Sequence, residues 1–141
     1  MAIEVGNIPA LDQQKVVGLG LAVPFLSSPT SGSDSLFKIT YTTAEQIKYN
    51  MINYFLHSRG ERILNPNFGS RIKEFLFEPD SIQSNEILKK YIEDEINLIF
   101  PIVTLNNIHI ESNPEYQVLT VRIFYSVFTS LNEFIELNIP L

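Results

Sequence analysis

The spacing of hydrophobic positions in this sequence changes near residue 100. Between residues 43 and 100 apolar side chains recur every three or four positions, whereas after residue 103 they alternate with polar ones. The first spacing is typical of a helix face and the second of a half-buried strand. Helices followed by strands predict an α+β fold with a small antiparallel sheet. Residues 1–42 have neither period and are expected to form an extended N-terminal arm and loop before a single domain over residues 43–141.

The first helix is expected to begin at Thr42 or Thr43. Either threonine is a suitable N-cap, since Glu45 or Gln46 follows three residues later and completes a capping box. The apolar stripe of this helix is Ile47, Met51, Ile52, Phe55 and Leu56. We expect the helix to end at residues 58–60, because the glycine there can adopt the positive φ of a C-terminal cap.

Two further helices are predicted before residue 101. Residues 60–70 form a turn-rich connection with two isolated apolar anchors, after which Ser70 is expected to cap a short helix. That helix carries Ile72, Phe75 and Leu76 and is terminated by Glu78-Pro79. Ser84 is expected to cap a longer helix that stops just before Pro101. The stripe of the longer helix is Ile87, Leu88, Tyr91, Ile92, Ile96 and Ile99.

The C-terminal part predicts three strands. Residues 105–111 alternate, residues 112–115 have the composition of a hairpin turn, and a loop at residues 130–132 precedes the third strand. The apolar face of the second and third strands is Leu119, Val121, Ile123, Tyr125, Val127, Ile135, Leu137 and Ile139. The other face of the second strand is half polar, with Arg122 beside Phe124. Three strands leave two unpaired edges, so either a partner strand is added or the N-terminal arm or a helix covers an edge.

Composition narrows the possible functions. A chain of 141 residues with 45% hydrophobic residues can bury a core without disulfides, and it has no cysteine. The net charge of −6 argues against a general nucleic-acid-binding surface. Four basic residues are nevertheless close together, either as a solvated rim or as a partner-facing patch: Arg59, Arg62, Arg71 and Lys73. No segment reaches the ~18 apolar residues of a membrane span, and the apolar run at residues 16–26 lacks the flanks of a signal peptide.

Candidate catalytic chemistry is sparse. Glycoside hydrolysis needs two carboxylates about 5 to 9.5 Å apart across a cleft. The candidate carboxylates are Glu61, Glu78, Asp80 and the cluster Glu93, Asp94 and Glu95. A salt bridge or a backbone contact in the turn is the simpler role for Glu61, and the cluster is expected on a polar helix face. His57 and His109 have no ligand-spaced companion, so no catalytic residue, cofactor site or metal site is predicted.

The connection after the first helix carries a more distinctive series of motifs. Residues 59–62 read Arg-Gly-Glu-Arg, Pro66 follows, residues 68–70 read Phe-Gly-Ser, and residues 76–78 read Leu-Phe-Glu. In this order and with these intervals, the series resembles the signature of the contractile-tail baseplate wedge family. That family includes the tailed-phage wedge subunit and the sheath initiator of type VI secretion systems, and some of its members have been labelled lysozyme-like. The resemblance covers about residues 18 to 139.

The resemblance implies a structural role in a tail baseplate. Members of this family are held by larger wedge proteins, and their sheet resembles the interlocking domain of the sheath protein. Extended arms of the first sheath subunits add strands to that sheet, with six copies of the subunit around the tail axis. The implied location is therefore the baseplate of a virion tail made in the host cytoplasm, or the cytoplasmic face of a bacterial injection system. The alternative is a baseplate-associated cell-wall glycosidase.

The resemblance also indicates which residues would contact partners. The family carries a Glu-Pro-Arg triplet between its last helix and first strand, where this chain has Phe100, Pro101 and Ile102. Apolar surface thus replaces a charged contact with wedge partners. The expected partner-binding residues are Arg59, Glu61, Arg62, Phe68, Phe100, Pro101, Ile102, Arg122 and Phe124. Gly60, Pro66 and Gly69 are expected to set the geometry of the loop.

Overall fold

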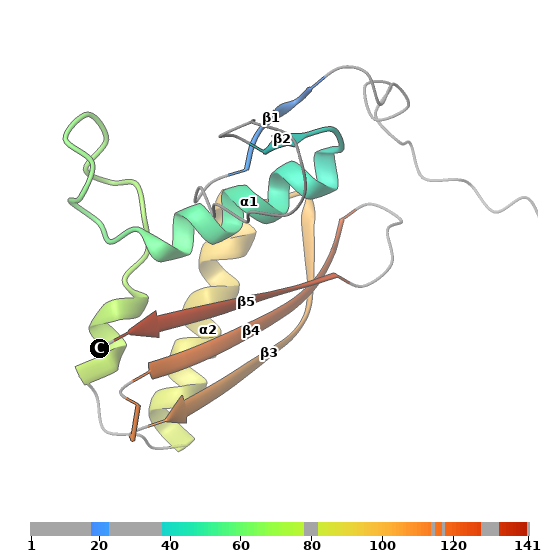
Figure 1. Cartoon of the computed structure of the whole chain (residues 1–141). Coiled ribbons are helices and arrows are strands. Elements are labelled where there is room, and N and C mark those ends of the chain that lie inside the picture. The colour runs from blue at the N-terminus through green and yellow to red at the C-terminus, as the bar shows by residue number, and fades with distance from the viewer. Residues whose placement is uncertain are drawn as a thin grey trace, which may run out of the picture. The chain divides into compact units, whose positions relative to one another are not determined.

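The computed structural model describes residues 18–22, 38–77, 82–113, 115–116, 118–127 and 133–140 (Figure 1). The chain divides into two compact units, the first ending at Asn53 and the second beginning at Tyr54. The divide between the two units falls inside helix α1 (Thr43–Leu56). None of the helices in the described ranges has both the length and the apolar character needed to cross a membrane.

The first unit contains a short antiparallel pair, β1 (Gly20–Leu21) and β2 (Ile39–Thr40). Two backbone hydrogen bonds flank the pair and join its two segments, from Leu19 N to Thr40 O at 2.8 Å and from Ala22 N to Lys38 O at 2.9 Å. The expectation of an extended arm and loop over residues 1–42 did not include this pair. Strands of two residues are too short to produce an alternating pattern of apolar and polar residues, so they cannot be predicted from periodicity. The remainder of the predicted arm lies outside the described residues.

Thr42 is the N-cap of α1, which confirms one of the two predicted positions. Its hydroxyl accepts a hydrogen bond from the backbone N–H of Glu45 at 3.2 Å. The Glu45 carboxylate also lies 3.0 Å from the ammonium of Lys38, next to β2. Gln46 accepts a hydrogen bond from the Thr40 hydroxyl and donates one to Asn50. These side chains fix the β1–β2 pair to the first turns of the helix.

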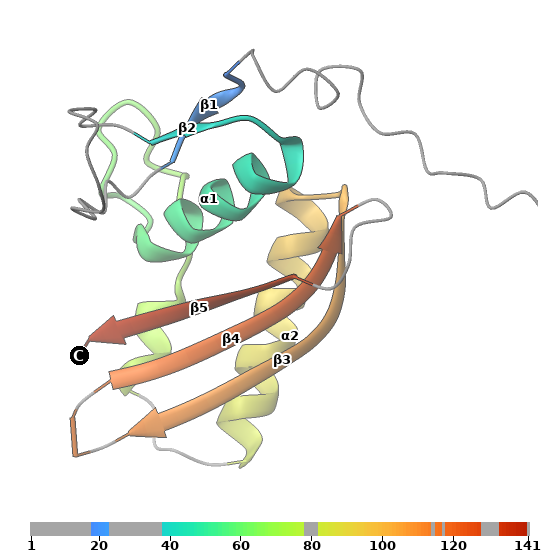
Figure 2. The same ribbon diagram turned by 45° about the vertical axis from the view of Figure 1, so that its right-hand side comes forward.

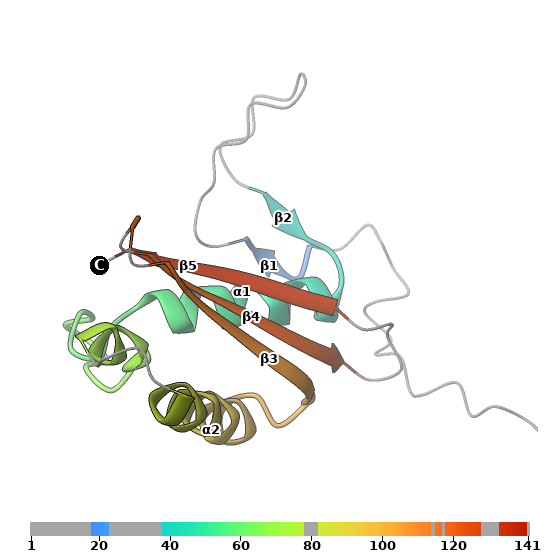
Figure 3. The same cartoon turned by 90° about the horizontal axis from the view of Figure 1, so that it is seen from below.

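The second unit confirms the α+β prediction. A three-stranded antiparallel sheet in the order β3-β4-β5 is formed by β3 (Val103–Asn113), β4 (Val118–Val127) and β5 (Glu133–Pro140). Helix α2 (Ile82–Ile99) lies across one face of this sheet (Figures 1 and 3). The 3₁₀ helix η2 (Ile72–Phe77) precedes α2 and contacts it.

The core of the second unit lies on the sheet face predicted from the alternation. Every inward-facing residue of β4 is buried, and the cross-strand register places Val121 between Ile110 and Leu137. Helix α2 contributes Leu88, Ile92 and Ile96 to the buried set. The buried face of α2 is narrower than the predicted apolar stripe, since the side chains of Ile87 and Ile99 are 54% and 42% exposed.

Several predicted boundaries require correction. α1 ends at Leu56 rather than at residues 58–60, and α2 begins at Ile82, so Ser84 lies inside that helix instead of capping it. The short helix after Ser70 has 3₁₀ geometry, with the Ser70 hydroxyl accepting from the Ile72 N–H at 3.5 Å. Strand β3 continues to Asn113, through the first half of the predicted turn. The predicted terminator Glu78-Pro79 and the loop at residues 130–132 lie outside the described residues.

The outer strands of the sheet, β3 and β5, differ in regularity (Figure 2). The register of β3 on β4 shifts between Leu105 and Asn107, which marks a bulge. The register of β5 on β4 is continuous from Tyr125–Glu133 to Val118–Pro140. Within the described residues neither strand has a second neighbour, so each keeps one unpaired edge. Bulges on edge strands hinder further pairing, and β5 is therefore the better template for an additional strand.

Candidate interaction surface

The loop between α1 and η2 is closed tightly at its base. The Ser70 N–H donates to the His57 carbonyl at 2.9 Å, and Ser58 and Ser70 form an isolated parallel bridge. Gly69 has a φ of 108°, and a Cβ there would lie 2.6 Å from the carbonyl oxygen of His57. Glycine is thus required at this position both by its backbone angle and by the close approach of the two chain segments.

Gly60 also has a positive φ, of 90°, but it does not cap a helix. It follows Arg59 in a turn in which the Glu61 N–H donates to the Ser58 carbonyl at 3.2 Å. A positive φ at the third position of a four-residue turn favours glycine. Its own N–H donates to the Pro66 carbonyl at 2.8 Å, so Gly60 and Pro66 together close the exposed part of the loop.

A buried polar group holds this loop to α2. Tyr54 donates a hydrogen bond to one carboxylate oxygen of Glu95, and Arg59 Nη2 donates to the other at 2.7 Å. Arg59 Nε also donates to the Gly69 carbonyl at 3.3 Å. Burial, together with the bond to Glu95, raises the pKa of Tyr54 to about 12. The Glu95 side chain is only 8% exposed, so the expectation that its acidic cluster lies on a polar face is wrong for Glu95.

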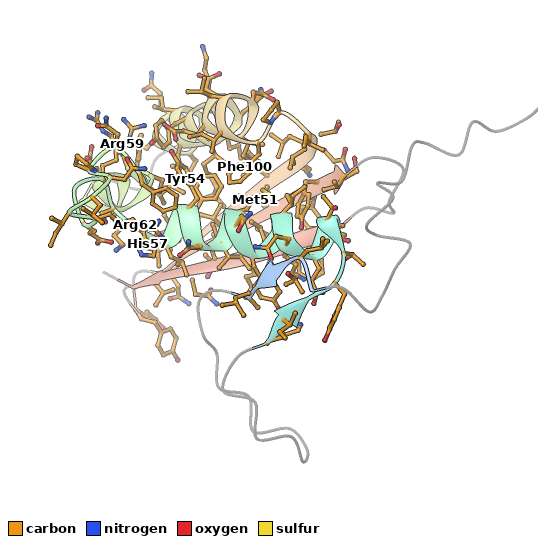
Figure 4. The ribbon with its side chains drawn as sticks, turned by 90° about the horizontal axis from the view of Figure 1, so that it is seen from above. Met51, Tyr54, His57, Arg59, Arg62 and Phe100 are labelled. Carbon is orange, nitrogen blue, oxygen red and sulfur yellow. The ribbon has the colours of Figure 1, made fainter. Side chains whose placement is uncertain are left out.

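Aromatic contacts extend from this group in two directions. The Tyr54 ring meets Phe68 edge-on at 5.4 Å between centroids, and it meets Phe100 edge-on at 5.9 Å. The Arg62 guanidinium carbon lies 3.8 Å from the centre of the Phe68 ring, in cation–π geometry. Figure 4 shows Tyr54 between Phe100 and the loop that carries Arg62. Tyr54 therefore connects the loop to the turn between α2 and β3.

That turn presents apolar surface. A backbone hydrogen bond from Val103 N to Phe100 O, 2.9 Å long, closes it, and the Phe100 ring lies against Tyr54. Pro101 is exposed, Ile102 is 50% exposed, and Leu98 in the last turn of α2 is 78% exposed. Exposed aliphatic side chains at neighbouring positions form a patch suited to protein contact.

The outer face of the sheet carries the remaining two predicted contact residues. Arg122 on β4 reaches Glu111 on β3 at 3.2 Å and Glu136 on β5 at 2.8 Å. The hydrogen bond from Arg122 holds the pKa of the Glu136 carboxyl below its ordinary value. Beside this ladder, the Phe124 and Phe134 rings lie 5.9 Å apart, with Phe134 55% exposed. These residues occupy the sheet face opposite α2.

The candidate catalytic carboxylates do not assemble into a pair. Glu61 lies 3.4 Å from the Lys73 ammonium, and hydrogen bonding to the backbone of Ser58 lowers the pKa of its carboxyl. Glu93 and Asp94 are exposed on α2, and Glu95 is committed to Tyr54 and Arg59. Among the residues that the structure describes, no group of three or more potential ligands could hold a metal ion. Glu78 and Asp80 lie outside the described residues.

The predicted contact residues thus form two groups. Arg59, Glu61, Arg62 and Phe68 belong to the loop, which Tyr54 joins to residues 100–102, whereas Arg122 and Phe124 lie on the outer face of the sheet. The roles of Tyr54 and Glu95, which connect the loop to the helix, were not predicted from the sequence. For Glu95 a signal existed, because it follows Leu88 by seven residues and Ile92 by three, on the buried stripe.

The comparisons with known proteins give the fold. The chain matches no protein-family model and no curated protein. Among solved structures it is similar to a candidate tail lysozyme from Geobacter sulfurreducens, with a TM-score of 0.64 and 19% sequence identity over 74% of this chain and 96% of that one. It is also similar to a chain of the anti-feeding prophage baseplate, with a TM-score of 0.59 and 22% identity over 75% of this chain and 82% of that one.

The chain has the fold of these two proteins.

Proposed function

We propose that this chain is a structural wedge subunit of a contractile-tail baseplate, where it templates the first sheath ring by accepting a strand from a sheath arm. The observation that carries the proposal is the fold shared with a chain of a six-fold baseplate, over most of the length of both chains. The motif series at residues 59–78 supports the same assignment, because it resembles the signature of the baseplate wedge family. The protein would then act in a tail baseplate, with six copies around the axis.

The free edge of β5 is the feature that strand addition would use. An added strand gains affinity from main-chain hydrogen bonds and specificity from alternate side chains. On β5 those side chains are Phe134, Glu136 and Asn138 on the outer face, and Ile135, Leu137 and Ile139 in the core. A sheath arm that alternates polar and apolar residues would continue both faces of the sheet.

The turn at residues 98–102 is proposed as the contact with the larger wedge proteins. Its exposed residues Leu98, Pro101 and Ile102 would pack on an apolar surface of the partner. This assignment agrees with the position of the charged triplet in the family that the sequence resembles. The partner surface is accordingly expected to be less charged than in other members of that family.

A cell-wall glycosidase is the second candidate, because one protein of the same fold is named as a candidate tail lysozyme. A glycosidase needs a carboxylic acid whose pKa is raised, so that it can protonate the leaving group at neutral pH. The pKa of Glu61 is shifted the other way, and its carboxylate is held by Lys73 and Ser58. Those contacts favour the structural role for Glu61. Peptidoglycan digestion by the purified chain, compared with its Glu61→Gln variant, tests the enzymatic alternative directly.

The decisive experiment for the structural role is a binding assay with the sheath and wedge proteins encoded beside this chain. Sheath is supplied in two forms, intact and without its terminal arms. We expect intact sheath to bind and the armless form not to bind. Hydrogen exchange on a mixture with a synthetic sheath-arm peptide should then show new amide protection along β5. Binding to wedge proteins without binding to sheath would refute the templating role but not the baseplate role.

A further inference from the structure

The loop at residues 61–67 displays two aliphatic side chains with almost no contact to the rest of the protein. Ile63 is 97% exposed and Leu64 is 99% exposed, the highest values among the exposed large hydrophobic residues of the described ranges. The other exposed aliphatic residues of the second unit, Ile87, Leu98, Ile99 and Ile102, are between 42% and 78% exposed. Such a bare pair at the tip of one loop contributes nothing to the stability of the fold.

The loop that carries this pair is nonetheless well ordered by internal contacts. Hydrogen bonds run from Asn65 N to Arg62 O at 3.2 Å and from Phe68 N to Asn65 O at 3.1 Å, and the bond between Gly60 and Pro66 closes the loop. Its two ends are joined at Ser58 and Ser70. A loop fixed in this way pays little ordering entropy when it binds, so its tip is preorganised for contact.

Charge around the tip is opposite in sign to that of the whole protein. Residues 59–74 contain four basic and two acidic side chains, a net charge of +2, against −6 for the chain. Three of the basic residues of this stretch lie within 4 Å of a carboxylate: Arg59, Arg71 and Lys73. Arg62 is the one basic residue of the stretch with no carboxylate partner in the described ranges, and it lies over the Phe68 ring beside the aliphatic pair.

We propose that the tip at residues 62–64 is an anchor that inserts Ile63 and Leu64 into an apolar pocket of a neighbouring baseplate protein, with a carboxylate at the pocket rim receiving Arg62. This inference rests on the proposed function and extends it, since it identifies a second contact beyond residues 98–102 and the chemistry of its partner. Ring contacts of Tyr54 with Phe68 and Phe100 join the tip at residues 62–64 to the turn at residues 98–102. One partner protein can therefore bind both surfaces.

The test uses the full chain and each wedge protein encoded beside it, with affinity measured by calorimetry. The double variant Ile63→Ser/Leu64→Ser should bind the wedge protein about a hundredfold more weakly, as expected for the loss of central apolar anchors. The matched control is Ile87→Ser/Tyr116→Ser, which removes two exposed apolar side chains of α2 and the β3–β4 hairpin. That control should retain wild-type affinity.

Arg62 is tested separately. Arg62→Glu should weaken binding about tenfold, and Arg62→Lys should weaken it less, since lysine keeps the charge but loses the planar stacking on Phe68. Added salt should weaken binding of the wild-type chain and strengthen binding of Arg62→Glu, because salt screens the repulsion between the new carboxylate and the rim carboxylate. If Arg62→Glu binds the wedge protein as tightly as wild type does, the proposed carboxylate at the pocket rim is refuted.

The outcomes separate this inference from the proposed function. If the wild-type chain binds no wedge protein, the proposed function fails and the anchor fails with it. If the wild-type chain and the Ile63→Ser/Leu64→Ser variant bind equally, the anchor alone is refuted. Flotation with phosphatidylglycerol vesicles tests a membrane as the target, and vesicle binding that disappears in the double variant while wedge binding is unchanged would also refute the anchor. Intact sheath binding and an unchanged urea midpoint show that the variant is folded.

Discussion

The guanidinium of Arg59 lies 2.7 Å from the carboxylate of Glu95, a residue that is 36 positions away in the chain and almost completely buried. Tyr54 donates to the same carboxylate. The Arg59–Glu95 pair joins the loop that follows α1 to the C-terminal part of α2, so the loop is positioned by a charge that cannot be solvated. The proposed contacts at residues 62–64 and 98–102 both depend on this arrangement.

Replacement of Glu95 should destabilise the protein more than replacement of its neighbour Glu93. Glu95→Gln leaves Arg59 without its counter-charge and buries an amide donor, which we expect to cost about 2 kcal/mol. Glu93→Gln is the matched control, because that carboxylate is exposed on the same helix. Urea unfolding should show a midpoint about 1 M lower for Glu95→Gln and an unchanged midpoint for Glu93→Gln. Equal midpoints would show that the buried pair does not stabilise the fold.

The two glycines of the loop should differ in their tolerance of alanine. Both have positive φ, of 90° at Gly60 and 108° at Gly69, which costs an alanine about 1 kcal/mol. A Cβ on Gly60 meets no atom within 4 Å, whereas one on Gly69 meets the His57 carbonyl oxygen at 2.6 Å. Gly69→Ala should therefore lower the melting temperature by several degrees more than Gly60→Ala. Melting curves of the two variants, recorded by circular dichroism, provide the measurement, and equal losses would contradict the close approach.

The raised pKa of Tyr54 predicts a loss of stability at alkaline pH. A phenol with an ordinary pKa of 10.0 and a folded-state pKa of about 12 stabilises the fold fully below pH 10, and this contribution is lost as the pH rises through 12. Between pH 9 and pH 11, titration of Tyr54 should lower the free energy of unfolding by about 1 kcal/mol.

The variant Tyr54→Phe isolates this effect. It should be less stable than wild type at pH 8, since Glu95 loses a donor, but its unfolding free energy should fall less steeply above pH 9. Tyr125, whose pKa is also raised by burial, remains in both proteins and contributes equally to each. Parallel pH profiles of the two proteins would show that Tyr54 does not titrate in this window.

The sequence predicted the parts of the fold in which one face is uniformly buried. Strand β4 alternates without a break from Leu119 to Val127, and a shift of one residue would expose that whole face, so its register was well determined. The bulge at Leu105–Asn107 was not predicted, because it depends on the pairing of β3 with its neighbour rather than on β3 alone.

The candidate site was harder to predict, for a different physical reason. Arg59 and Arg62 are separated by two residues and look alike in sequence, yet one pairs with a buried carboxylate and the other lies on an aromatic ring. Nothing in the local sequence shows that Ile63 and Leu64 are exposed, whereas the closed loop of the structure does. Such distinctions arise from tertiary contacts between α2 and the loop, which local patterns do not contain.

The ion pair of Arg122 with Glu136 predicts the response to acid. The hydrogen bond from Arg122, supported by one from Asn138, holds the pKa of the Glu136 carboxyl below its ordinary value of 4.5. A carboxyl with a lowered folded-state pKa stabilises the protein above its ordinary pKa, and this contribution is lost as the pH falls through the folded-state value. Stability should therefore decline below pH 5, and less steeply in Glu136→Gln than in wild type.

The variant Arg122→Gln removes the main cause of the lowered Glu136 pKa and keeps the Glu136 carboxyl itself. Titration of the Glu136 side-chain carbon by nuclear magnetic resonance should show a higher pKa in Arg122→Gln than in wild type, and 1 M NaCl should reduce the difference because the pair is exposed. Glu93→Gln serves again as the control for the acid profile, since Glu93 has no ion pair among the described residues. An unchanged Glu136 titration in Arg122→Gln would mean that Asn138 alone sets its pKa, and the outer-face ladder would then lack the charge coupling inferred from its geometry.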